Sequence, residues 1–215
     1  MKRTELLIGA IVSLAVVAAT VAGCMDAFGG PNRTLNLPAS PGSNPSLEAP
    51  TLAATPSPSP DEATPAVIDS ALLDYLPEAI SGIPVTEAAD EAALALADPA
   101  LPRIATALDV GLALDEATGN LVTAHVVRLR EGAFDEAMFR QWRDSYDDGA
   151  CAAAGGVNGR LEPTIDGRTV FVTSCVQGLR TYHVWIEDQQ LLISASSVGA
   201  GRFGELLMAE LRVEP

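Results

Sequence analysis

From about residue 67 onward, helical and strand-like hydrophobic patterns follow each other along the chain. The clearest helical pattern spans residues 134–148. Large side chains recur there at every fourth position, with Phe139 beside them: Phe134, Met138, Trp142 and Tyr146. This spacing places them on one face of a helix. We therefore predict a helix that packs this face against the core and ends at Gly149.

Shorter helical patterns lie before and after this segment. We predict helices at Ile68–Leu76, Asp90–Ala97 and Leu101–Leu108, and a closing helix that carries Phe203, Leu206, Leu207 and Leu211. Asp69 or Ser70 is a suitable N-cap for the first of them.

Three pairs of strand-like segments are joined by turn residues. The pairs are 110–115 with 121–130, 161–165 with 169–175, and 181–187 with 191–197. Asp166-Gly167, between the second pair, is a typical type I′ hairpin turn. Hairpins next to separate helices are typical of the α+β class. We predict an antiparallel sheet of about five to six strands with the helices packed on one face.

The beginning of the chain has a different pattern. Lys2 and Arg3 precede an uncharged apolar run from Leu6 to Ala22, and small residues follow in Val21-Ala22-Gly23-Cys24. This layout is typical of a secretory signal. Because it ends in cysteine, it resembles the lipobox of bacterial prolipoproteins.

The resemblance implies that residues 1–23 are a signal peptide and that Cys24 is acylated with diacylglycerol and becomes the mature N-terminus. The expected location is the extracytoplasmic face of the cell membrane, where the lipid holds the protein. Two alternatives are an uncleaved membrane helix, for which the run is short, and ordinary secretion.

Composition divides the remaining chain into two parts. Residues 24–66 are rich in Pro, Ser and Ala, with few large apolar side chains. Such a segment buries too little surface to offset its chain entropy, so we predict a disordered tether. Residues 67–215 are long enough for a single exported domain with its own core.

The charge balance limits the possible partners. The chain has 28 acidic and 13 basic residues, for a formal net charge of −15. Nucleic acid binding needs the opposite field, so we expect no nucleic acid partner. The simplest interpretation of this acidic surface is that it keeps the protein soluble. The alternative is that it binds a cationic partner or divalent ions.

Cys151 and Cys175 remain after Cys24 is assigned to the anchor. An even pair in an exported domain predicts a structural disulfide. It closes a loop of about 25 residues, for a stabilisation of about 3.5 kcal/mol.

Three features are candidates for chemistry. Asp144, Asp147 and Asp148 crowd the end of the main helix and are weak candidates for a metal site. His125 and His183 lie in predicted strands, and they would face each other if those strands were neighbours. Residues 199–204 match the glycine pattern of dinucleotide sites but lack the parallel strand that should follow, so we interpret them as a flexible link.

No motif identifies a catalytic residue, a metal site or a cofactor site, and we expect no cofactor. The favoured hypothesis is a membrane-anchored lipoprotein with a non-catalytic binding or scaffolding domain. Its partner would be an envelope protein or a hydrophobic ligand. The alternatives are an envelope hydrolase that uses carboxylates or histidine, and a carrier of a lipid. An apolar cavity between helix 134–148 and the sheet would favour the carrier.

Overall fold

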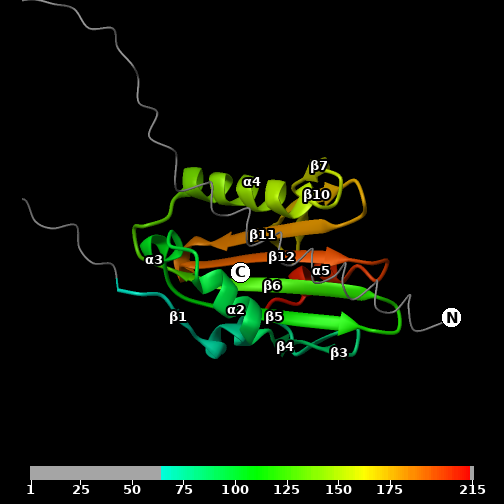
Figure 1. Cartoon of the computed structure of the whole chain (residues 1–215), viewed down its shortest axis with the longest axis horizontal. Coiled ribbons are helices and arrows are strands. Elements are labelled where there is room, and N and C mark those ends of the chain that lie inside the picture. The colour runs from blue at the N-terminus through cyan, green and yellow to red at the C-terminus, as the bar shows by residue number, and fades with distance from the viewer. Residues whose placement is uncertain (1–63, 214–215) are drawn as a thin grey trace, which may run out of the picture.

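The computed structural model describes residues 64–213 (Figure 1). The predicted signal peptide, Cys24 and most of the predicted tether lie outside the described residues. Ala66 is buried, one residue before the predicted start of the domain. None of the helices in residues 64–213 is long and apolar enough to span a bilayer.

An eight-stranded sheet forms the centre of the molecule. Its strands follow each other across the sheet in the order β1 (Val67–Ile68), β5 (Ala105–Asp115), β6 (Asn120–Leu129), β12 (Leu191–Val198), β11 (Arg180–Ile186), β10 (Phe171–Cys175) and β7 (Val157–Leu161). The eighth strand, β4 (Thr86–Glu87), also pairs with β5. β1 runs parallel to β5, whereas all other pairs are antiparallel.

The predicted α+β class is confirmed, but the predicted sheet was too small and the actual sheet is mixed. The added strands β1 and β4 have two residues each. Two residues are too few to show an alternating pattern, so the sequence does not predict that these strands pair with β5.

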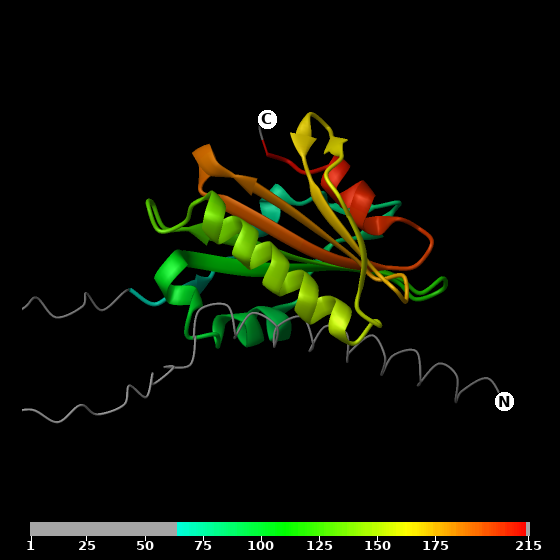
Figure 2. The same cartoon turned by 90° about the horizontal axis from the view of Figure 1, so that it is seen from above.

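Helical segments cover both faces of the sheet, and not one face as predicted (Figure 2). One core cluster joins the sheet to α2 (Ala89–Leu96), α3 (Leu101–Ile104) and α4 (Glu136–Ala152). The other joins the opposite face to the 3-10 helix η2 (Ser70–Tyr75) and to α5 (Phe203–Ala209). Successive side chains of a strand point to opposite faces. Each central strand therefore contributes side chains to both core clusters, one on each face of the sheet.

Three helix predictions need correction. In the segment predicted as a helix from Ile68 to Leu76, Ile68 belongs to strand β1 and only Ser70–Tyr75 is helical, as the 3-10 helix η2. The segment predicted as a helix from Leu101 to Leu108 is helical only to Ile104, and β5 begins at Ala105. A segment this short contains too few apolar positions to distinguish a helical period from a strand period. α4 also continues through Gly149 to Ala152, because Ala150 and Cys151 are fully buried there and packing outweighs the low helix propensity of glycine.

The remaining elements are short. Two hairpins, β2 (Ala79–Ile80) with β3 (Ile83–Pro84) and β8 (Thr164–Ile165) with β9 (Arg168–Thr169), lie beside the main sheet. The 3-10 helix η3 (Glu187–Gln189) joins β11 to β12. The predicted turn at Asp166-Gly167 is confirmed, since both residues have positive φ, 48° and 76°. Asp69 caps η2, as expected, by accepting a hydrogen bond from the Ala71 N–H.

The predicted disulfide is present. Cys151 at the end of α4 is bonded to Cys175 at the end of β10, with their Cα atoms 5.2 Å apart. The bond joins the last turn of α4, the longest helix in residues 64–213, to the sheet.

Candidate functional site

Two polar rows cross the face of the sheet that α4 covers. Sheet register makes Ser194 of β12 the direct neighbour of both His125 on β6 and His183 on β11. The next row runs from β7 to β6 and holds Arg160, Thr173, Thr181, Ser196 and Thr123. The hydroxyl and imidazole groups of both rows therefore face the helix.

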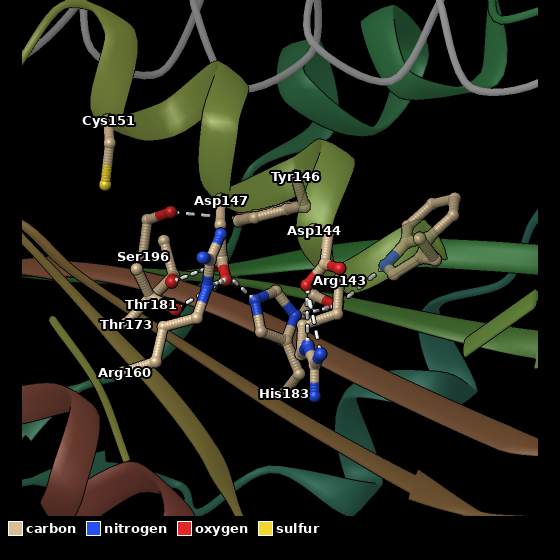
Figure 3. A network of polar contacts seen from close by, with 12 residues as sticks. Arg143, Asp144, Tyr146, Asp147, Cys151, Arg160, Thr173, Thr181, His183 and Ser196 are labelled. Atoms are coloured by element: carbon tan, nitrogen blue, oxygen red, sulfur yellow. Dashed lines mark hydrogen bonds and ion pairs between the residues drawn. The ribbon is translucent and has the colours of Figure 1, made fainter. Parts of the chain in front are cut away.

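Asp147 brings a carboxylate from α4 into the middle of these rows (Figure 3). The hydroxyls of Thr173 and Thr181 donate to its two oxygens. His183 Nε2 lies 2.9 Å from Oδ1, and Arg160 lies 3.8 Å from Oδ2. Burial alone would raise the pKa of Asp147, but the contacts with His183, Thr173 and Thr181 outweigh it and the pKa is lowered. The carboxylate is thus held in its charged form.

A neutral His183 gives each of its ring nitrogens a suitable hydrogen-bond partner. The ionised Asp147 only accepts, so Nε2 of His183 carries the hydrogen. The indole N–H of Trp142 donates to Ser194 Oγ at 3.1 Å, and Ser194 Oγ lies 2.9 Å from His183 Nδ1. The serine hydroxyl therefore donates to Nδ1. The hydrogen bonds run in one direction, from Trp142 through Ser194 and His183 to Asp147.

Tyr146 connects this series to the second histidine. Its hydroxyl lies 3.1 Å from Ser196 Oγ and 3.5 Å from His125 Nδ1. Its ring meets the ring of His183 edge to face at 5.0 Å. Burial lowers the pKa of His125 to about 4, so this imidazole is neutral at neutral pH.

The order Ser194–His183–Asp147 is that of a serine nucleophile, its base and an orienting acid. However, Ser194 is 1 % exposed and its oxygen is already engaged by Trp142. His183 and Asp147 are fully buried. No substrate carbonyl can approach Ser194 Oγ in this arrangement, so we interpret the network as the polar interface that fixes α4 on the sheet.

The structure separates the three predicted aspartates. Asp144 pairs with Arg143 at 3.0 Å, Asp148 pairs with Arg160 at 3.6 Å, and only Asp147 points into the sheet. In residues 64–213 no three acidic, histidine or cysteine side chains gather in a way that would hold a metal ion. His125 and His183 do not face each other directly, because β12 lies between their strands.

A groove of about 820 Å³ lies on the opposite face of β10 and β11. Its apolar walls come from the β7–β8 segment, β10 and α5: Leu161, Pro163, Ile165, Val172, Leu206 and Ala209. Leu161 is 63 % exposed. Proteins commonly bind small molecules in hollows of roughly 300–1,000 Å³, so the groove has the size of a ligand site.

Three charged side chains line one part of the groove. Arg180 of β11 donates to Glu205 of α5, and Arg202 lies 3.6 Å from the same carboxylate. The fully buried Tyr182 lies next to them, and its hydroxyl interacts with Glu205 and Arg180. Burial raises the pKa of Tyr182, and the Glu205 carboxylate raises it further. The groove therefore combines apolar walls with one polar region.

The glycine-rich segment 199–204 forms part of this wall. Gly199 adopts a φ of 98°, and the Gly201 N–H donates to Asn120 Oδ1 at 2.7 Å. A Cβ on Gly204 would lie 2.1 Å from the ring of Tyr182. Gly204 thus allows α5 to rest on Tyr182, and the segment serves as the link from β12 to α5.

A second hollow, of about 390 Å³, lies near η3 and the start of α4. Its lining includes Phe139, Phe171, Trp185 and acidic side chains. It does not reach Ser194 or His183 either.

Sequence reasoning missed most of these residues. Thr181 alternates with His183, and Ser194 alternates with Ser196, which is typical of strands with one face in water. That pattern did signal a continuous polar face, but it gave no sign that a helix covers it. The groove residues Arg180, Tyr182, Arg202 and Glu205 carry no local signal, because they come from separate elements.

Comparisons with protein-family models, with curated proteins and with solved structures find no match to this chain.

Proposed function

We propose that this chain is a lipoprotein anchored at the extracytoplasmic face of the membrane, whose domain binds an amphipathic ligand in the α5 groove without catalysis. The proposal of an anchor rests on the Val21-Ala22-Gly23-Cys24 motif. The proposal of binding rests on the groove beside α5, which has apolar walls and one polar region.

The groove supports the carrier hypothesis, although it lies elsewhere than the sequence suggested. At the interface of α4 with the sheet, Phe139 packs against Phe171 and Trp185, and the smaller hollow opens there at the start of α4. The larger groove lies on the other face, between α5 and the segment that carries Leu161, Pro163 and Ile165. Apolar walls favour a ligand that carries a hydrocarbon portion.

The hydrolase hypothesis has less support. The series Ser194, His183 and Asp147 has suitable residue types, but a buried hydroxyl that accepts from Trp142 offers no nucleophile to a substrate. We therefore favour binding over catalysis.

Titration with Nile red, a neutral dye that fluoresces in apolar sites, tests the binding function. We would use the full chain with Cys24→Ser, which excludes the anchor's own acyl chains. We expect saturable binding that Ala209→Trp abolishes, because the indole would occupy the groove. Ala152→Trp is the matched control, since Ala152 is also an exposed alanine in the last turn of a helix and does not line the groove. Equal binding by both variants, or no binding at all, would overturn the proposal.

A further inference from the structure

The charges in the groove bear on which kind of amphipath it accepts. Arg180, Arg202 and Glu205 are the charged residues that line it. Two guanidinium groups and one carboxylate leave one positive charge in a chain whose formal net charge is −15. The overall field repels anions, so a positive region at the groove has to act at short range.

The two arginines are bound differently. Arg180 donates a hydrogen bond to Glu205, whose side chain is 19 % exposed. Burial opposes ionisation of Glu205, but hydrogen bonding and the two arginines lower its pKa, so the carboxylate stays charged. The negative charge of Glu205 is therefore neutralised by its ion pair with Arg180.

Arg202 remains available to a ligand. Its side chain is 70 % exposed, and its contact with Glu205 is an ion pair at 3.6 Å, longer than a hydrogen bond. A guanidinium group presents paired N–H donors that suit a carboxylate or a phosphate. The buried hydroxyl of Tyr182 interacts with Glu205 and Arg180, so Arg202 is the exposed cation that a ligand can reach.

We propose that the groove selects an acyl chain with a single anionic headgroup, a carboxylate or a phosphate monoester, and that Arg202 binds this headgroup. The hydrocarbon chain lies along Leu161, Ile165 and Leu206. The inference rests on the proposed function, because it names the ligand class of the same groove.

Displacement of Nile red by three ten-carbon amphipaths tests the selection. We would compare decanoate, decanol and decylammonium below the concentrations at which they aggregate. Hydrogen bonds to charged groups contribute about 1.5–3 kcal/mol, so decanoate should compete at least about tenfold better than decanol. Decylammonium should be the weakest competitor. Decyl phosphate is tested in the same way, to distinguish a phosphate headgroup from a carboxylate. The proposal requires that decanoate or decyl phosphate displaces Nile red more strongly than decanol does.

Two variants test the role of Arg202. Arg202→Gln should remove the preference for decanoate over decanol, so that both amphipaths displace Nile red from this variant equally well. Arg103→Gln makes the same change of charge at an exposed residue of α3 on the opposite face, and it should retain the preference.

The outcomes separate the two proposals. If Nile red binds but decanoate and decanol compete equally, the headgroup selection is wrong and the binding function stands. If Nile red does not bind, the binding function itself fails. Preference for decylammonium, or a preference for decanoate that survives in Arg202→Gln, would also overturn the assignment.

Discussion

Asp147 shows how a charge is accommodated between a helix and a sheet. A buried carboxylate is costly unless its oxygens are hydrogen-bonded. Thr173, Thr181 and His183 provide these hydrogen bonds, and Arg160 is a more distant cation. Removal of the carboxylate would leave several buried donors without an acceptor.

We predict that Asp147→Ala lowers the free energy of unfolding by about 3 kcal/mol or more, since each buried donor that loses its partner costs about 1–3 kcal/mol. Urea unfolding followed by circular dichroism measures the effect. Asp144→Ala is the control on the same helix, because the Asp144 side chain is half exposed and pairs only with its neighbour Arg143. Equal destabilisation by both substitutions would contradict the role of Asp147.

His125 predicts a pH dependence of stability. Burial lowers the folded-state pKa of His125 to about 4 from its ordinary value of 6.5. Between these two values the unfolded chain binds the proton and the folded chain does not, so stability falls as pH falls from about 6.5 to about 4. The difference corresponds to about 3 kcal/mol.

Unfolding free energies measured across this range, for the natural chain and for His125→Gln, check the prediction. In the variant, the contribution of His125 to the change of unfolding free energy with pH should be absent, whatever the stability of the variant at pH 7. Asp147 acts in a lower window, because its lowered pKa contributes stability above about pH 3.9 that is lost as pH falls through the folded value. Identical slopes for the two chains above pH 4 would refute the assignment.

At the scale of elements, α4 is fixed at both ends and along its buried face. Its first turn is capped by Asp135, whose side chain accepts from the Met138 N–H at 2.8 Å. Its last turn is bonded to β10 through Cys151 and Cys175. Between these ends, Phe139, Trp142 and Tyr146 are buried against the sheet.

We predict that reduction of the disulfide lowers stability by about 3.5 kcal/mol, from the entropy of a loop of about 25 residues. Urea unfolding with and without dithiothreitol measures this effect. The double variant Cys151→Ala and Cys175→Ala should show no response to dithiothreitol. If the natural chain also shows none, the bond contributes nothing to stability.

The elements differ in how far their sequence predicted them. The aromatic repeat of residues 134–148 was sufficient for α4, and Asp166-Gly167 for the β8–β9 turn, because both signals are local. Residues 105–108, Ala-Thr-Ala-Leu, are too few to show a period, so helix and strand were indistinguishable there. The alternation of Thr181 with His183 marks a polar strand face, but nothing in it indicates that α4 covers this face and supplies Asp147 and Tyr146 as partners.

At the scale of the whole molecule, the main prediction concerns the N-terminus. Diacylglycerol provides two acyl chains, and two chains hold a protein stably where one does not. We expect the protein from its native host to lack residues 1–23 and to carry a diacylglycerol mass at Cys24. Intact mass spectrometry of the membrane fraction checks this.

Cys24→Ser is the control, because serine lacks the thiol that receives the lipid. This variant should retain residues 1–23 and carry no added lipid. A natural chain that retains Met1, or that has a bare thiol at Cys24, would contradict the anchor.

The sequence by itself determined the features with local causes. Hydrophobic spacing specified the main helix and most strands, turn chemistry specified the hairpins, and an even pair of cysteines indicated the disulfide. Only the tertiary structure decided which polar strand face α4 would cover, and that Arg180, Tyr182, Arg202 and Glu205 would meet at one groove. The physical reason is that these contacts join residues of separate elements, and their position depends on strand order and on which face each helix packs against.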